Sequence, residues 1–440
     1  MIDVEGRVLS GLDEFMLRGG HLIVLTRVAH DMGASWRRIH RELAKVLSGN
    51  VVVSGAENAD VAEYLAEKKL CRNASSKSGS YNEDNLRYPH LEVLRLSSGR
   101  LEVRHIAPGS EVEVTWQDRN LADRRVRSRV GAITWNAKAG SKTGLSHVTD
   151  WAELLELVNG AGQLSPVGRL IATLTGATNL KYEEWNPYVF GHEKIFLAYE
   201  YFRRDFDIFA RFAPRLVEAN RLTKARSQEL FVLALMEACK DAEKSRTISS
   251  RQKFELHRQL RDLERSARRS DKKTVETSTG WHRAASRLET YTDLGLLEKA
   301  KDAEKEKYQY IYYPTDQLKK AVETLNKSKS ADSWLYQHLS EVILQTQAAG
   351  ESPSSKSVVA DLSEIVRALS LPTTLLPIYC LALGLVYLHA RRGNSISLQQ
   401  ARDALEALPS HEPDIARLAR GREGTRAEFL SVNLRKVASN

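Results

Sequence analysis

A strongly basic segment at residues 244–273 is the feature that most constrains this chain of 440 residues. It holds eleven Lys and Arg residues against four Asp and Glu residues, so its net charge is +7, most of the +9 of the whole chain. A helix this basic is better suited to a polyanion than to a neutral small-molecule substrate. The segment therefore indicates a nucleic acid as the partner.

The residues that follow the basic segment predict a helix and two strands. Apolar residues at helical spacing predict a helix over 279–294, and a glycine ends it. A strand follows at 296–298, then a charged loop at 299–307 and a second strand at 308–313, where alternating residues stop at Pro314.

This order resembles the third helix and the wing of winged-helix domains, and the resemblance is confined to residues 277–314. It implies DNA binding in which the helix lies in the major groove and its exposed face contacts base edges. One face of the helix is expected to be buried through Trp281, Ala284, Ala285, Leu288 and Tyr291. The opposite face would carry His282, Arg283, Ser286, Arg287, Glu289 and Thr290. His282, Arg283 and Arg287 are therefore the candidates for base contact.

Two clusters of cations are candidates for contact with phosphates. After internal i,i+4 pairs are discounted, the basic helix leaves Arg261, Arg265, Arg268, Arg269, Lys272 and Lys273. The second cluster, in an expected loop with a nearby Trp135, is Arg124, Arg125, Arg127 and Arg129. The alternative for each cluster is a solvated surface without a ligand.

The pattern as a whole predicts a mainly α fold with small antiparallel β elements, divided into several domains. Residues 1–145 read as a mixed α/β N-terminal domain, for which an elaborated winged helix is one form. Residues 146–245 read as a helical domain, 246–330 as the basic helix with the winged helix, and 357–412 as a C-terminal helical domain.

Several local elements support this division. Alternating residues predict strands at 91–96 and 101–106, joined as a hairpin, with a third strand at 111–116. Aromatic residues spaced by three and four over 188–212 predict the packed face of a long helix. Helices are also expected at 332–347, 358–369, 374–389 and 397–408, and the tail beyond Pro413 is expected to be mobile.

No motif identifies a catalytic centre, and neither a metal site nor a cofactor is predicted. The Lys-Thr pair after Gly140 lacks the spacing of a phosphate-binding loop. Glu111 and Glu113 share a strand face, which is the nearest approach to a divalent-metal nuclease, but they lack the lysine of such a site. A divergent metal-dependent nuclease is therefore an alternative function.

Composition completes the sequence-based account. We expect no secretory leader, because the first residues hold no basic stretch followed by an apolar run, and no disulfide framework, because the three cysteines are distant from one another. The longest apolar run is too short to span a bilayer. We expect a cytoplasmic, non-catalytic protein that binds double-stranded DNA and protein partners, without a membrane or a small-molecule cofactor. It would be a subunit of a DNA-handling assembly in transcription, chromosome maintenance or anti-phage defence. A protein-interaction scaffold is the second alternative, since winged helices also bind proteins.

Overall fold

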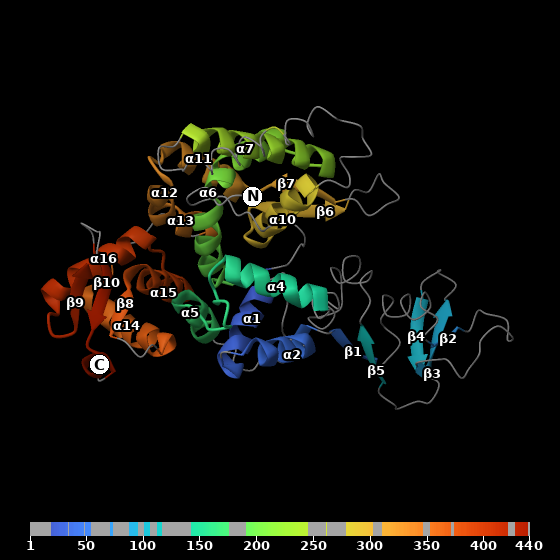
Figure 1. Ribbon diagram of the computed structural model, residues 1–440, viewed down its shortest axis with the longest axis horizontal. Coiled ribbons are helices and arrows are strands. Elements are labelled where there is room, and N and C mark those ends of the chain that lie inside the picture. The colour runs from blue at the N-terminus through green and yellow to red at the C-terminus, as the bar shows by residue number, and fades with distance from the viewer. Residues whose placement is uncertain are drawn as a thin grey trace. The chain divides into compact units, whose positions relative to one another are not determined.

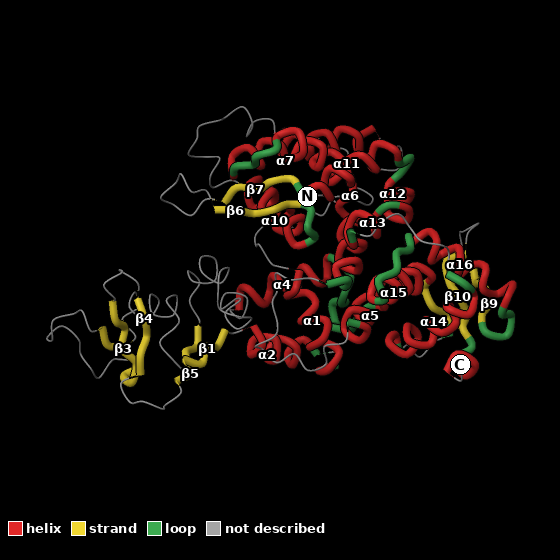
Figure 2. Tube along the Cα trace, turned by 180° about the vertical axis from the view of Figure 1, so that it is seen from behind, coloured by secondary structure: helices red, strands yellow, loops and turns green. Residues whose placement is uncertain are grey.

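The protein is mainly helical. The computed structural model describes residues 19–33, 35–47, 49–53, 71–73, 88–95, 101–105, 112–116, 142–175, 191–244, 261, 279–301, 310–345, 353–370, 374–420 and 427–438. These residues form fourteen helices and ten strands. The strands belong to small sheets of two or three strands (Figure 2). The predicted fold class is confirmed at this level.

The chain divides into two compact units. The smaller unit covers residues 40–146 and 179–187, and the larger unit holds the remainder. Residues 1–39, assigned from the sequence to the N-terminal domain, group with the larger unit. There, α1 (Gly19–Met32) packs on α5 (Pro166–Leu174), and α5 packs on α14 (Ser355–Leu369) (Figure 1).

The smaller unit contains the strands expected near residue 100. β3 (Tyr88–Arg95) and β4 (Leu101–His105) form the predicted antiparallel hairpin, and β2 (Cys71–Asn73) adds to β3 in parallel. The sequence predicts that β5 (Val112–Trp116) is the third strand of this sheet. In the structure β5 pairs instead with β1 (Gly49–Val53). Alternation of apolar and polar residues predicts a strand, but it leaves the partner strand open.

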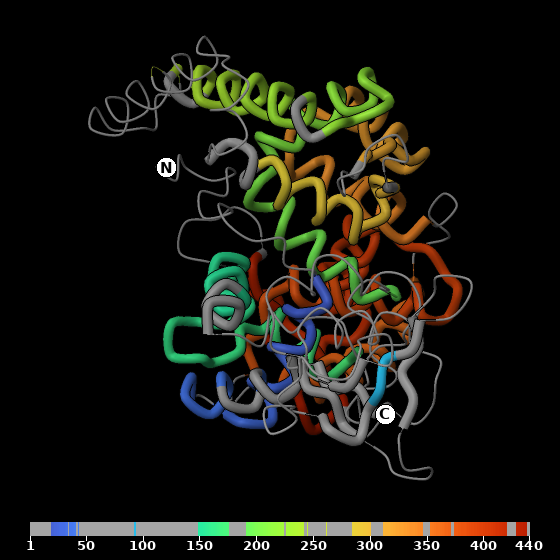
Figure 3. Tube along the Cα trace, turned by 90° about the vertical axis from the view of Figure 1, so that its right-hand side faces the viewer, coloured from blue at the N-terminus to red at the C-terminus, as the bar shows by residue number. Residues whose placement is uncertain are grey.

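The core of one half of the larger unit forms around α6 (Lys194–Ala219), which is kinked at Asp205. Its buried aromatic residues contact both Tyr291 and Trp334, with ring centroids of Phe209 at 5.6 Å and 5.4 Å from theirs. The assignment of this aromatic face to packing is confirmed for the described residues, and Tyr188 and Phe190 lie outside them. α7 (Lys224–Lys244) lies alongside α6 (Figure 3).

The predicted helix and strand pair after the basic segment are present. They form α10 (Thr279–Asp293), β6 (Leu297–Lys301) and β7 (Tyr310–Pro314), and the two strands pair antiparallel. Leu222, between α6 and α7, adds a short bridge to Tyr312 through backbone hydrogen bonds of 3.0 and 3.1 Å. Thr315 then caps α11 (Asp316–Lys327).

The C-terminal part is helical, with three departures from expectation. The helix predicted at 332–347 is broken at His338 into α12 (Ala331–Gln337) and α13 (Leu339–Leu344). Of the helix predicted at 374–389, the first residues form β8 (Leu375–Pro377), because Pro377 cannot donate a backbone hydrogen bond to a helical turn, and α15 (Ile378–Arg391) follows.

The third departure is the tail beyond Pro413, which is ordered over much of its length. α16 (Leu398–His411) begins with the predicted capping box of Ser397 and Gln400. β10 (Ala427–Val432) then pairs with both β8 and β9 (Ala416–Arg420), before the short α17 (Leu434–Ala438). Leu430 and Val432 are buried, so apolar burial within a charged tail orders the segment.

The remaining helices are α2 (Trp36–Leu47) and α4 (Lys142–Leu154). None of the helices in the described part of the chain has the length and apolar composition that crossing a membrane requires.

Close packing at Gly168 gives a test of the fold. A Cβ atom there would lie 2.1 Å from the carbonyl oxygen of Leu157, which also accepts a hydrogen bond from the Ser165 amide at 3.0 Å. We expect Gly168→Ala to reduce the free energy of unfolding by about 1–3 kcal/mol, measured by urea denaturation followed by circular dichroism. Gly160→Ala is the control, because a Cβ there meets no atom within 4 Å. Equal losses in the two variants would contradict the packing argument.

Candidate nucleic-acid interface

The middle of α10 is buried on all sides. Six consecutive residues, 284–289, are at most 3% exposed, and α10 packs against α7 and β6. A helix that lies in a groove of DNA must present a face to solvent in the free protein. This stretch of α10 has no such face.

Arg287 is bound inside the core by Asp205 of α6. Both side chains are fully buried, and the guanidinium donates two hydrogen bonds to the carboxylate, Nε to Oδ2 at 2.7 Å and Nη2 to Oδ1 at 2.8 Å. The Tyr201 hydroxyl donates to the same carboxylate at 3.0 Å. The Arg287 guanidinium also lies 4.9 Å from the centroid of the Phe231 ring. The group is a fork-to-fork ion pair, enclosed by aromatic rings.

The electrostatics of this pair keep the Arg287 guanidinium charged. Burial alone lowers the pKa of the Arg287 guanidinium, but the attraction and hydrogen bonds of Asp205 outweigh it, so the pKa of Arg287 is raised above its usual value. Burial, followed by the neighbouring Asp205 charge, raises the pKa of the Tyr201 hydroxyl well above its usual value. Tyr201 therefore acts as a neutral hydrogen-bond donor.

The expectation that Arg287 contacts DNA from an exposed face is wrong, because the side chain is 0% exposed. Arg287 lies three residues after Ala284 and four before Tyr291, which is the spacing of the buried face. The sequence-based prediction placed Arg287 on the exposed face of the helix only because its side chain is charged. Asp205, an acid within the aromatic spacing of α6, was the signal of a buried partner and was missed.

Glu289 was also expected on the exposed face and is instead fully buried. Its carboxylate accepts a hydrogen bond from the Tyr312 hydroxyl at 2.7 Å and forms an ion pair with Lys299. Because Lys299 belongs to β6 and Tyr312 to β7, this group attaches the strand pair to α10. Lys299, which the sequence places in a charged loop, thus has its ammonium in the interior.

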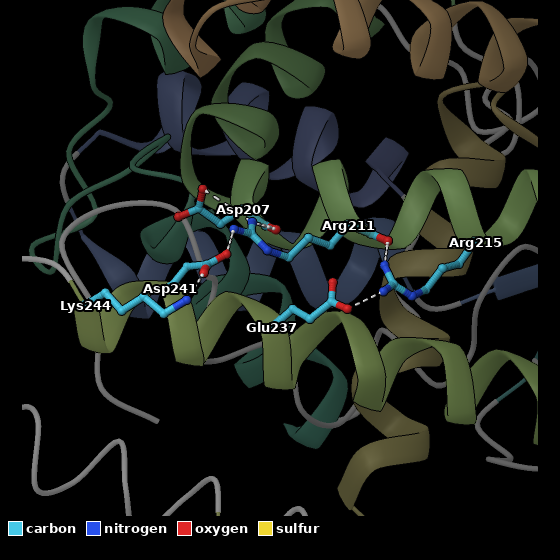
Figure 4. A network of polar contacts seen from close by, with 6 residues as sticks. All are labelled: Asp207, Arg211, Arg215, Glu237, Asp241 and Lys244. Atoms are coloured by element: carbon cyan, nitrogen blue, oxygen red, sulfur yellow. Dashed lines mark hydrogen bonds and ion pairs between the residues drawn. The ribbon is translucent and has the colours of Figure 1, made fainter.

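The outer side of α6 and α7 carries a ladder of ion pairs (Figure 4). Arg211 pairs with Asp241 at 2.7 Å, Arg215 with Glu237 at 2.5 Å, and Lys244 with Asp241 at 3.4 Å. With Asp207 beside Arg211, the ladder contains three cations and three carboxylates, so its net charge is zero. Such exposed pairs each contribute about 0–1 kcal/mol. This surface does not attract phosphate through an excess of charge.

The other predicted contact residues are only partly described. Arg261 is exposed and helical. The backbone of His282 and Arg283 belongs to the first turn of α10, and their side chains lie outside the described residues. The rest lie wholly outside them: Arg265, Arg268, Arg269, Lys272, Lys273, Arg124, Arg125, Arg127 and Arg129. The structure therefore neither brings these cations together nor separates them.

We recognise no catalytic centre among the residues that the structure describes. No group of three or more His, Cys, Asp or Glu residues in that part could hold a metal ion. Glu113 belongs to β5 without a described side chain, and Glu111 lies outside the described residues. The nuclease alternative stays a prediction.

Comparison with known proteins does not assign the chain to a family. No protein-family model, no curated protein sequence and no solved structure matches it. The functional interpretation rests on the chain's own residues.

The buried pair gives a stability test with a sharp contrast. Arg287→Met leaves the Asp205 carboxylate buried without its cation, and we expect a loss of about 3–5 kcal/mol in unfolding free energy. Asp205→Leu combined with Arg287→Met should recover most of the loss, because an apolar pair of similar volume needs no desolvation of charge. Arg211→Ala, in the exposed ladder, is the control and should cost about 0–1 kcal/mol. Chemical denaturation measures all three, and a loss in Arg287→Met no larger than in Arg211→Ala would contradict the assignment.

Proposed function

We propose that this protein binds double-stranded DNA without catalysing a reaction on it, through the basic segment at residues 244–273 attached to a winged-helix unit. The segment supplies most of the binding energy by contact with phosphates. The observation that carries the proposal is the position of this +7 segment directly between α7 and α10.

The order of elements around the segment supports the winged-helix part of the proposal. α6 is followed by the bridge at Leu222, then by α7, α10 and the β6–β7 pair. Because Leu222 pairs with β7, the strand order is Leu222, β7, β6. Winged-helix domains also have three helices followed by a small sheet, so the order of the described elements supports the proposal.

The distribution of charge supports phosphate contact by the segment. Its ends are attached to the unit, since Lys244 is the last residue of α7 and Thr279 the first of α10. The neighbouring ladder on α6 and α7 is neutral, so it adds nothing to the excess of cations between α7 and α10. Cations concentrated in this way release counterions from DNA on binding.

Burial of α10 changes the expected mode of recognition. With Arg287 and Glu289 in the core, the middle of the helix has no side chain left to contact a base edge. Base contact would be restricted to the first turn, through His282 and Arg283. Binding that depends on phosphates is largely independent of DNA sequence and strongly dependent on salt.

The direct test removes four cations from the segment. Arg261, Arg265, Arg268 and Arg269 changed together to Ala should weaken duplex binding by a similar factor on every DNA sequence. The slope of log affinity against log salt should flatten by about one unit for each phosphate that the variant no longer neutralises. Electrophoretic mobility shift across a salt series measures both quantities.

The matched control removes the same charge from other surfaces, with Lys327, Lys329, Lys356 and Arg367 changed to Ala. All four are exposed, on or next to α11 and α14. If the control variant loses as much DNA affinity and as much salt dependence as the segment variant, the loss reflects the net charge of the chain and not contact by the segment. That result would contradict the proposal.

The non-catalytic part of the proposal has its own test. Incubated with duplex DNA and Mg²⁺ or Mn²⁺, the chain should leave the DNA intact on a denaturing gel. Metal-dependent cleavage that disappears in the Glu111→Gln, Glu113→Gln double variant would replace the proposal by the nuclease alternative.

A further inference from the structure

A polar cavity of about 700 Å³ lies in the larger unit. Its lining residues come from the C-terminal end of α1, the end of α4 with the loop after it, and the start of α5, which are labelled in Figure 1. The volume is within the range of small-molecule binding sites, roughly 300–1,000 Å³. Its wall includes the polar side chains of Glu153, Glu156, Asn159, Gln163, Ser165 and Arg169.

The wall of the cavity is held by its own hydrogen bonds. The Asn159 side-chain oxygen accepts from the amides of Ala161 and Gln163, both at 3.0 Å, and a β-bridge joins Val158 to Leu164. From α2, the Trp36 indole donates to the Gly160 carbonyl at 3.0 Å. The loop is therefore preorganised before any ligand arrives, which lowers the entropic cost of binding.

Glu156 belongs to this wall, and two arginines of α6 form ion pairs with its carboxylate. Its carboxylate contacts Arg203 at 3.1 Å and Arg204 at 2.5 Å. Its backbone has a φ of 50°, in the left-handed region that non-glycine residues rarely adopt. Backbone strain of this kind persists where surrounding contacts enforce it, and it gathers at functional sites.

Glu153 and Arg169 differ from Glu156 because neither has a partner within the described part of the chain. Both line the cavity and are half-buried, yet they form no ion pair with each other. The Nε atom of Arg169 is buried and has no hydrogen-bond acceptor among the described residues. Partial burial of an unpaired charge costs free energy, so each of the two side chains would be stabilised by a complementary group.

We propose that this cavity binds a small phosphate ester that also carries hydroxyl groups, such as a sugar phosphate or a mononucleotide. Arg169 binds the phosphate, because a guanidinium presents a fork of donors that matches two phosphate oxygens. Arg169 and Ser165 also belong to the beginning of α5, where the helix dipole favours an anion. Glu153 accepts hydrogen bonds from the hydroxyl groups. The ligand thereby satisfies both charges across one cavity.

Isothermal titration calorimetry of the full chain tests the proposal with four probes: ribose 5-phosphate, AMP, ribose and adenosine. At least one of the two phosphate esters should bind at least tenfold more tightly than its unphosphorylated counterpart. Arg169→Gln should weaken that binding at least tenfold, and Arg169→Lys, which keeps the charge but not the fork, should be intermediate. Absence of phosphate-ester binding to the wild-type chain at millimolar concentration would overturn the proposal.

Two further variants separate binding from folding. Arg367→Gln, on the exposed side of α14, should bind as the wild type does; equal weakening in this variant would overturn the role of Arg169. Glu153→Gln should weaken ribose 5-phosphate but leave inorganic phosphate unchanged, which a merely structural role would not predict. Arg169→Gln should unfold at or slightly above the wild-type temperature without ligand, because this arginine has no side-chain partner within the described part of the chain, and should gain no thermal stability from the ester. A lower melting temperature for the unliganded variant would instead show a structural arginine and overturn the assignment. DNA binding should be unaffected by these changes, so the two proposals fail independently.

Discussion

The ion pair between Asp205 and Arg287 is the interaction on which the larger unit depends. It joins α6 to α10 in the interior, at the residue where α6 is kinked, and it is surrounded by aromatic side chains. Removal of two charges from water is costly, and two well-aligned hydrogen bonds and the Tyr201 hydroxyl offset that cost. An interior of this kind tolerates only one relative position of the two helices, because any shift leaves a charge unpaired.

The second buried group extends the same constraint to the strands. Glu289 connects α10 with Lys299 of β6 and Tyr312 of β7, and Tyr312 pairs in turn with Leu222. The helix, the strand pair and the segment between α6 and α7 are therefore linked through polar contacts as well as apolar packing. The unit has a rigid interior, and the connection between α7 and α10, which contains residues 245–273 of the basic segment, is attached to it at both ends. We infer that DNA is held by that connection rather than by the middle of α10.

Local sequence signals predicted the helices and strands well, but predicted poorly which residues are buried and which strands pair. The limits of α10, the capping box of Ser397 and the hairpin near residue 100 follow from spacing, caps and turns, which are properties of neighbouring residues. Arg287 was misplaced because its burial depends on Asp205, 82 residues away. The pairing of β5 with β1 and the position of the cavity likewise depend on contacts distant in sequence. Spacing alone can mark Arg287 as a residue of the buried face, but no local pattern identifies the distant partner in such a contact.

Hydrogen exchange measured by mass spectrometry, with and without duplex DNA, tests the central claim most directly. If α10 is an internal element, amides of residues 284–289 are protected in the free protein and their exchange rates do not change with DNA, while peptides from 244–278 gain protection. A gain of protection that is confined to 284–289, with none in 244–278, would mean that α10 leaves its partners to bind DNA. That result would contradict both the internal role of Arg287 and the proposed interface.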